Sequence, residues 1–110
     1  KRFVNKMEIT VIGQAFFVVN RQSHFEYIIS AGDTRVKVVG TVFSINALPH
    51  EQEVKVSVEA GEVQLTYKKG DNSLLVEAGE EAIFNSRLRT MKKQPKTSDI
   101  YIVYQPDRNQ

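Results

Sequence analysis

The sequence contains no cysteine and no tryptophan, and only two of its 110 residues are histidines. Without cysteine, the chain can form neither disulfides nor thiolate metal sites. A cupin-type metal centre needs two or three histidines that converge with a carboxylate on one ion, whereas His24 and His50 lie in separate expected loops. We therefore expect no metal site and no cofactor.

Motifs for nucleophilic catalysis are also missing. The sequence has no Gly-x-Ser-x-Gly elbow, and its carboxylates are scattered over strands and turns instead of forming a pair. We expect that the chain is not an enzyme. A carbohydrate-binding β-sandwich is an alternative function, which would use a pocket lined by Tyr27, Tyr67 or Tyr101 with amide partners.

Charge and hydrophobicity exclude two further classes. The sequence contains 15 Lys and Arg residues and 13 Asp and Glu residues, so its net charge is only +2 and it has no basic footprint for a nucleic acid. No apolar run reaches the roughly 18 to 20 residues that span a bilayer. Because the sequence begins with Lys1 and not Met, we expect targeting segments and a membrane anchor to lie outside it.

Residues 35–47 form the longest β-branched run, and their hydrophobic alternation changes phase in the middle. Val36 and Val38 occupy even positions, whereas Phe43 and Ile45 occupy odd ones, so a single flat strand would send one set into water. Gly40 stands at the break, where a glycine is typical of a bulge or sharp bend. This pattern indicates one bent strand that feeds two sheets, or two edges of one curled sheet.

The rest of the chain alternates in short segments separated by turn residues. Strands are expected at residues 8–20, 25–31, 53–59, 63–67, 74–77, 81–85 and 100–104, with a weaker one at 88–91. The tetrapeptide Glu-Ala-Gly-Glu occurs at 59–62 and again at 77–80, as the same turn chemistry used twice. The spacing predicts an all-β, antiparallel, jelly-roll-like sandwich.

Glycines and aromatic residues have structural roles in this prediction. Gly13, Gly40, Gly61 and Gly79 are expected at turns or bulges, because glycine adopts backbone conformations that other residues avoid. The expected core includes Phe17, Phe43, Ile45 and Phe84, with Phe16 and Phe25 as further members.

Five basic residues stand within ten positions without an intervening acid: Arg87, Arg89, Lys92, Lys93 and Lys96. One interpretation is an edge strand that lysines protect from aggregation. The other is a docking patch for an acidic partner or lipid head groups. If a partner docks on an exposed edge, we expect it to add a strand to the sheet.

Several motifs in this order resemble the periplasmic domain of FecR-type anti-sigma regulators. They are Gly-x-Ala-x-Phe at 13–17, the strand from Phe25, Val-x-Gly-Thr-x-Phe at 38–43, Ala-Gly-Glu-Val at 60–63 and Ala-Gly-Glu-x-Ala at 78–82. Ala78 stands where the family often has proline. The resemblance covers about residues 8–93 and implies a FecR-like domain over 1–93. Residues 94–110 would be a linker plus a terminal strand, either the start of a further module or a strand of the sandwich.

The resemblance implies the periplasmic, signal-receiving domain of a single-pass inner-membrane protein. Its partner would be the signalling domain of a TonB-dependent outer-membrane transporter. The extracytoplasmic-function sigma factor would be bound only by a cytoplasmic part outside this chain. No catalysis and no nucleic-acid contact are implied for the domain itself.

Overall fold

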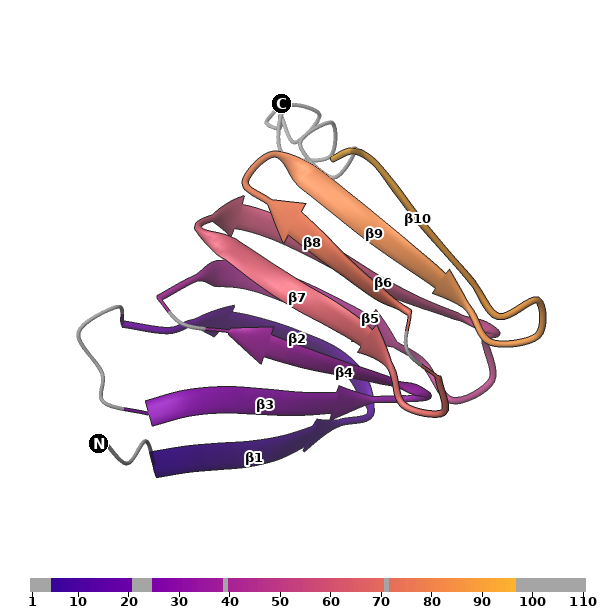
Figure 1. Ribbon diagram of the computed structural model, residues 1–110, viewed down its shortest axis with the longest axis horizontal. Coiled ribbons are helices and arrows are strands. Elements are labelled where there is room, and N and C mark those ends of the chain that lie inside the picture. Colours follow the sequence, from indigo (N-terminus) through magenta and orange to yellow (C-terminus); the bar gives the residue numbers. More distant parts are fainter. Residues whose placement is uncertain (1–4, 21–24, 39, 71, 97–110) are drawn as a thin grey trace, which may run out of the picture.

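The chain folds into two stacked β-sheets, as described for residues 5–20, 25–38, 40–70 and 72–96 in a computed structural model (Figure 1). The front sheet contains, in spatial order, β1 (Asn5–Val11), β3 (Phe25–Ala31), β4 (Thr34–Val38), β7 (Glu62–Tyr67) and β8 (Ser73–Glu77). The back sheet contains β10 (Thr90–Pro95), β9 (Glu80–Asn85), β6 (Glu53–Ala60), β5 (Val42–Ala47) and β2 (Gly13–Val18). The expected all-β sandwich is confirmed.

The chain builds the sandwich one hairpin at a time. The hairpins β3–β4 and β7–β8 lie in the front sheet, and β5–β6 and β9–β10 lie in the back sheet, so the chain changes sheets after each hairpin. Seven strand pairings are antiparallel, but β1 pairs with β3 in parallel, which departs from the expected antiparallel arrangement. The cause is β2, which returns through the back sheet, so that β3 starts in the same direction as β1.

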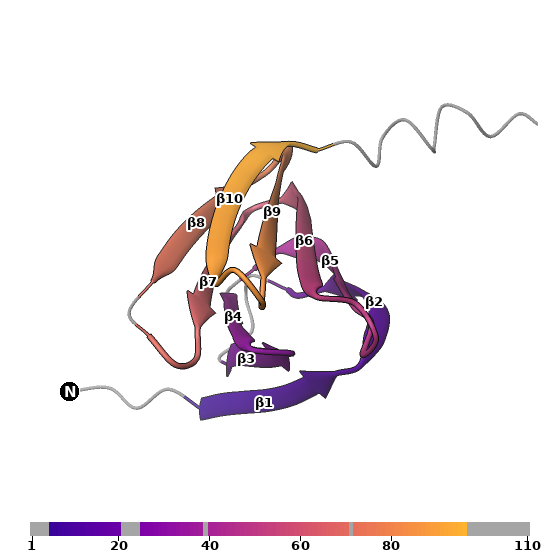
Figure 2. The ribbon, with the colours of Figure 1, turned by 90° about the vertical axis from the view of Figure 1, so that its right-hand side faces the viewer.

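The two ends of the sandwich are built differently. The four hairpin turns gather at the right-hand end in Figure 1, and this end faces the viewer in Figure 2. At the left-hand end, the chain crosses between sheets at three tight corners, at Gly40, Gly61 and Gly79. We call these the corner end and the hairpin end. Gly13 makes a fourth crossing, at the hairpin end.

All four crossing glycines have positive φ: 106° at Gly13, 62° at Gly40, 82° at Gly61 and 87° at Gly79. At Gly61 space is also limiting, since a Cβ atom there would lie 2.7 Å from the carbonyl oxygen of Gly40. Residues with side chains rarely adopt this φ, and the close approach excludes a methyl group as well. The corners therefore require glycine where the hydrophobic alternation changes phase.

Hydrogen bonds connect the three corners to one another across the two sheets, and we call these connected turns the corner column. The N–H of Val19 donates to the carbonyl of Thr41, and the Thr41 hydroxyl donates to the carbonyl of Glu62. The N–H of Ala78 donates to the carbonyl of Gly61 at 3.1 Å, so the two Glu-Ala-Gly-Glu turns lie against each other. The corner end is therefore closed by backbone contacts between the sheets.

The core lies between the sheets, where alternate residues of each strand meet. Phe43, Ile45 and Phe84 are buried there, and Phe17 is half-buried with its ring stacked 5.0 Å from that of Phe43. Phe16 was wrongly expected in the core: its side chain is 64% exposed. Successive residues of a strand point to opposite faces, so Phe16 and Phe17 cannot both face inward.

Three further expectations are corrected or untested. Residues 35–47 form two strands, β4 and β5, in different sheets. Residues 94 and 95, expected to begin a linker, are part of β10, and the weaker strand expected at 88–91 begins only at Thr90, after a turn at residues 86–89. The strand expected at 100–104 lies outside the described residues.

Candidate functional site

The five basic residues interpreted as a docking patch are spread along β10 from one end of the sandwich to the other. Lys96 lies at the corner end, with its Nζ 2.6 Å from Oε2 of Glu59 and only 4% of its side chain exposed. Lys93 crosses to the front sheet, where its Nζ donates to the carbonyl of Leu75 at 3.1 Å and pairs with Glu80 at 3.4 Å. Lys93 therefore joins the two sheets, whereas Lys96 fastens the end of β10 to β6 within the back sheet.

Arg87, Arg89, Lys92 and Lys93 are exposed, and of these Lys93 makes the contacts just described. Arg87 and Arg89 belong to the β9–β10 turn, on either side of Leu88, which is 65% exposed. Asn85 fixes this turn, because its Oδ1 accepts hydrogen bonds from the N–H groups of Arg87 and Leu88 at 3.0 and 2.9 Å. The turn therefore displays two guanidinium groups and a leucine at the hairpin end.

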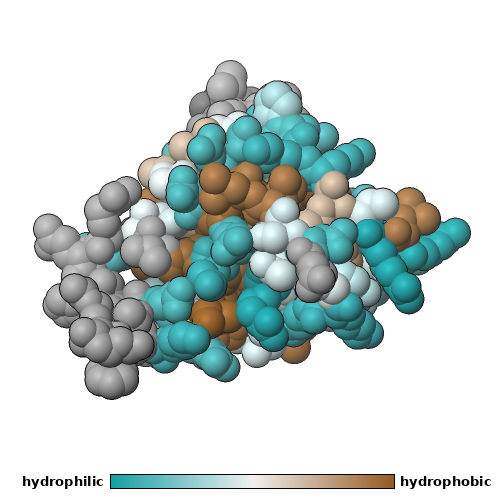
Figure 3. All heavy atoms as spheres, viewed as in Figure 1, coloured by the Kyte–Doolittle hydropathy of each residue, from teal (hydrophilic) through white to brown (hydrophobic). Residues whose placement is uncertain are grey.

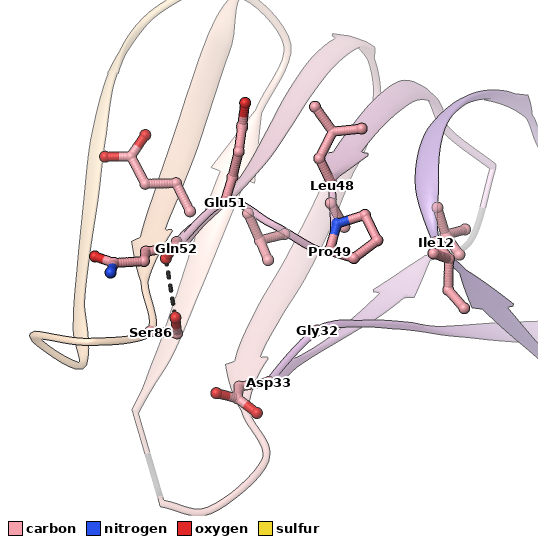
Figure 4. Close-up of a pocket in the computed structure, with 12 residues that line it drawn as sticks. Ile12, Gly32, Asp33, Leu48, Pro49, Glu51, Gln52 and Ser86 are labelled. Carbon is pink, nitrogen blue, oxygen red and sulfur yellow. Dashed lines mark hydrogen bonds between the residues drawn. The ribbon is translucent and has the colours of Figure 1, made fainter.

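A pocket of about 330 Å³ opens between the sheets at the hairpin end (Figure 4). Its apolar lining includes Val11, Ile12, Leu48 and Pro49, and its polar lining includes Asp33, Gln52 and Ser86. The carbonyl of Gln52 accepts hydrogen bonds from the N–H and the hydroxyl of Ser86, at 2.7 and 3.0 Å. These two bonds join two turns of the back sheet. The pocket is the gap that remains between those turns and the front sheet.

The outward side of the back sheet carries a second hollow, of about 660 Å³. Side chains from three adjacent strands line it: Gln14 and Phe16 from β2, Ser44 and Asn46 from β5, and Lys55 and Ser57 from β6. Oδ1 of Asn46 is buried without a hydrogen-bond partner among the described residues. The hollow is shallow and borders the free edge of the sheet.

A buried carboxylate lies on the same side of the back sheet, on β9. Glu81 is 1% exposed, and its two carboxylate oxygens accept hydrogen bonds from the Ser57 hydroxyl at 3.4 Å and from Nε2 of Gln94 at 2.8 Å. These bonds join three adjacent strands, β6, β9 and β10. A carboxylate with bonds to both oxygens is held in place, which is typical of a structural group.

The front face of the molecule is largely hydrophilic, with hydrophobic patches over the middle of the sheet (Figure 3). Leu75 on β8 is 45% exposed on this side. A hollow beside it is lined by polar and charged side chains, including Lys37, Glu62 and Gln64. This mixture indicates a solvated sheet face.

Of the three tyrosines considered for carbohydrate binding, the two in the described part of the chain pack against the core. Tyr67 stacks against the buried Phe84, with ring centroids 5.1 Å apart, and Tyr27 packs against the core. Tyr101 lies outside the described residues. Within the described ranges, no group of three His, Asp or Glu side chains could hold a metal ion, and no helix could span a membrane.

Sequence reasoning missed the exposed apolar residues of β2 and of the crossing between β1 and β2. Ile12, Phe16 and Val18 are 76%, 64% and 71% exposed. The available signal was the absence of charge: β2 and β5 are the two described strands without a single charged residue. The sequence analysis did not use this signal and assigned Phe16 to the core.

Comparisons with known proteins give similarity in structure but not in sequence. No protein-family model and no curated protein matches the chain. Two crystal structures of proteins from Parabacteroides distasonis, both described as candidate anti-sigma factors, share the fold. The first has a TM-score of 0.78 and 21% identity over 94% of this chain, and the second has a TM-score of 0.74 and 23% identity over 87%. The chain spans 48% and 45% of their lengths, about half of each.

Proposed function

We propose that the chain is the signal-receiving β domain of a FecR-type anti-sigma regulator. The observation that carries this proposal is where the family-like motifs fall in the fold. The motifs at residues 38–43, 60–63 and 78–82 each contain a sheet-crossing glycine of the corner end, and the motif at 13–17 begins with the fourth. Two candidate anti-sigma factors share this fold over most of the chain, which supports the same assignment.

In this proposal the domain works in the periplasm and belongs to a protein anchored in the inner membrane. It receives a signal from the signalling domain of a TonB-dependent outer-membrane transporter. The sigma factor is bound by a cytoplasmic part of the same protein and not by these residues. The domain carries out no catalysis, and its function is to bind a protein.

We place the transporter contact at the β9–β10 turn and the adjoining edge of β10. Arg87, Arg89 and Lys92 present three exposed cations there, beside the exposed side chain of Leu88. Guanidinium groups around an apolar anchor suit a protein partner with acidic residues at its rim. The free edge of β10 offers backbone groups to which a strand of the partner can pair.

The test is binding of the chain to purified signalling domains of TonB-dependent transporters, measured by calorimetry at two salt concentrations. We expect a complex that weakens with added salt and that is weakened about tenfold or more by the triple variant R87E/R89E/K92E. The matched control is R35E, which reverses an exposed arginine on the front sheet.

Three outcomes would contradict parts of the proposal. If no signalling domain binds even at high micromolar concentration, the proposed function is wrong. If one binds but the triple variant binds equally well, the function stands and the assigned surface is wrong. Binding of an isolated sigma factor to this chain would contradict the assignment of sigma-factor binding to the cytoplasmic part of the protein.

A further inference from the structure

The free edge of β2 differs from the other sheet edges in the described part of the chain. Edge strands usually carry charges or proline, which prevent pairing with other chains. Three of the four edges follow this rule: β1 contains Lys6 and Glu8, β8 contains Glu77, and β10 contains two lysines and Pro95. The sequence of β2, Gly-Gln-Ala-Phe-Phe-Val, contains neither. Its backbone is therefore unprotected against strand addition.

The uncharged surface extends beyond the edge strand itself. The neighbouring strand β5 also lacks charged residues, so the back sheet ends in a strip two strands wide that has no charge. On its outward side, Phe16 is 64% exposed and Val18 is 71% exposed. Large apolar side chains exposed beside an unpaired strand edge are typical of a surface that another protein covers.

We propose that a second copy of this chain covers this edge by antiparallel pairing of β2 with β2. A twofold axis brings the same surface of each copy together, so any charge near the axis lies close to the same charge of the other copy and is repelled by it. The β2–β5 strip has none to repel. The pairing joins the two back sheets into one continuous sheet.

Side-chain complementarity fixes the register of this pairing. With the axis at Phe16, the Phe16 rings of the two copies stand opposite each other on the outward side of the joined sheet. Val18 of one copy then lies opposite Gln14 of the other, and Phe17 opposite Ala15. A cross-strand aromatic pair adds to the stability of a sheet, and large residues opposite smaller ones pack without clashes. A register centred on Phe17 would pair rings that face the core, where Phe17 already stacks against Phe43.

The first test is the oligomeric state of the 110-residue chain, measured by sedimentation velocity from low micromolar to millimolar protein. We expect reversible dimers. The variant Val18→Lys puts a cation on the outward side of the edge and should raise the dimer dissociation constant about tenfold or more. Leu88→Lys is the matched control, because Leu88 is similarly exposed, at 65%, but lies in the β9–β10 turn. It should leave the dimer unchanged.

A second test uses the absence of cysteine from the chain, which makes any introduced thiol unique. Directly opposite residues of antiparallel strands have Cα separations of about 4.5–5.5 Å, within the range that a disulfide bridges. Phe16→Cys should therefore cross-link into a dimer on mild oxidation, much faster than Leu88→Cys. Circular dichroism of each variant confirms that the sheets are intact.

Three results would overturn the inference: a monomer throughout the concentration range, a dimer that Val18→Lys does not weaken, or equal cross-linking of the two cysteine variants. In the first case a strand from a different protein becomes the occupant of the edge. The inference is independent of the proposed function, because binding of a transporter signalling domain is assigned to β10, on the opposite edge of the back sheet.

Discussion

Nζ of Lys96 lies 2.6 Å from Oε2 of Glu59, and this ion pair fastens the end of β10 to the corner column. The backbone takes part too, since the N–H of Lys96 donates to the carbonyl of Gly79 at 2.9 Å. The lysine side chain is 4% exposed and the glutamate side chain 39% exposed. A buried ammonium group depends on such a partner, because removing it from water is costly.

Glu59→Gln should therefore destabilise the domain. We expect a loss of about 1–3 kcal/mol in the free energy of unfolding, because the buried lysine loses its charged partner. Urea denaturation measures this loss. The control is Glu62→Gln in the same tetrapeptide, where the exposed side chain should tolerate the change. Equal losses in the two variants would show that the ion pair contributes little.

Gly61→Ala should be more damaging than Gly79→Ala. Both glycines have nearly the same φ, 82° and 87°, within the same tetrapeptide sequence, so both variants bear the strain of a left-handed alanine, about 1–2 kcal/mol. Only at Gly61 does the new methyl group meet a backbone atom, the carbonyl oxygen of Gly40 at 2.7 Å. We expect an additional loss of about 1–3 kcal/mol in Gly61→Ala, measured by thermal and urea unfolding. Similar losses would mean that the corners move apart easily.

Stability should fall in acid partly through Glu80. A hydrogen bond from the N–H of Glu77, supported by nearby Lys93, lowers the pKa of the Glu80 carboxyl from its ordinary value of 4.5. The folded state therefore favours the ionised form, and this contribution is complete above the ordinary pKa and disappears as the pH falls through the lowered one.

Glu80→Gln tests this pH dependence. The wild type should be more stable than the variant at neutral pH, and the difference should shrink as the pH falls below 4.5. Urea unfolding curves across this range provide the measurement, with Glu77→Gln as the control from the same turn. A difference that stays constant down to the most acidic pH would rule out the carboxylate as its source.

Phe43→Ala and Phe16→Ala compare two phenylalanines on adjacent strands. Phe43 is fully buried between the sheets, so its truncation leaves a cavity and should cost about 3–5 kcal/mol of unfolding free energy. Phe16 points outward, and its truncation should change the stability of the monomer by less than about 0.5 kcal/mol. A large loss from Phe16→Ala at low protein concentration would place that ring in a packed environment.

The sequence contained enough to predict the layers of the sandwich. The shift of hydrophobic alternation around Gly40 requires the chain to pass from one sheet to the other, and the chain does so there. Alternation cannot decide between Phe16 and Phe17, because either parity of β2 buries one ring. The neighbouring strand β5 decides between them, because Phe17 stacks against Phe43 of that strand.

Pairing between distant segments explains two further features that sequence patterns cannot predict. β10 has the composition of a loop, with two lysines and a proline, and it becomes a strand because β9 presents a ladder that an edge strand can complete. The basic residues looked like one patch along the sequence. Their separation follows from pairing, since Lys92 and Lys93 point to opposite faces of β10 and Lys96 reaches Glu59, 37 positions earlier.

The closed corner end and the open hairpin end differ in their tolerance of insertions. Added residues at Gly61 or Gly79 would push apart turns that share backbone hydrogen bonds. At the hairpin end, the tips of the β5–β6 and β9–β10 turns, at residues 49–51 and 87–89, are exposed and lie outside the bonds between Ser86 and Gln52, so added residues there leave those bonds in place. Loop grafting at the hairpin end is thus the practical route to giving this scaffold a new binding specificity.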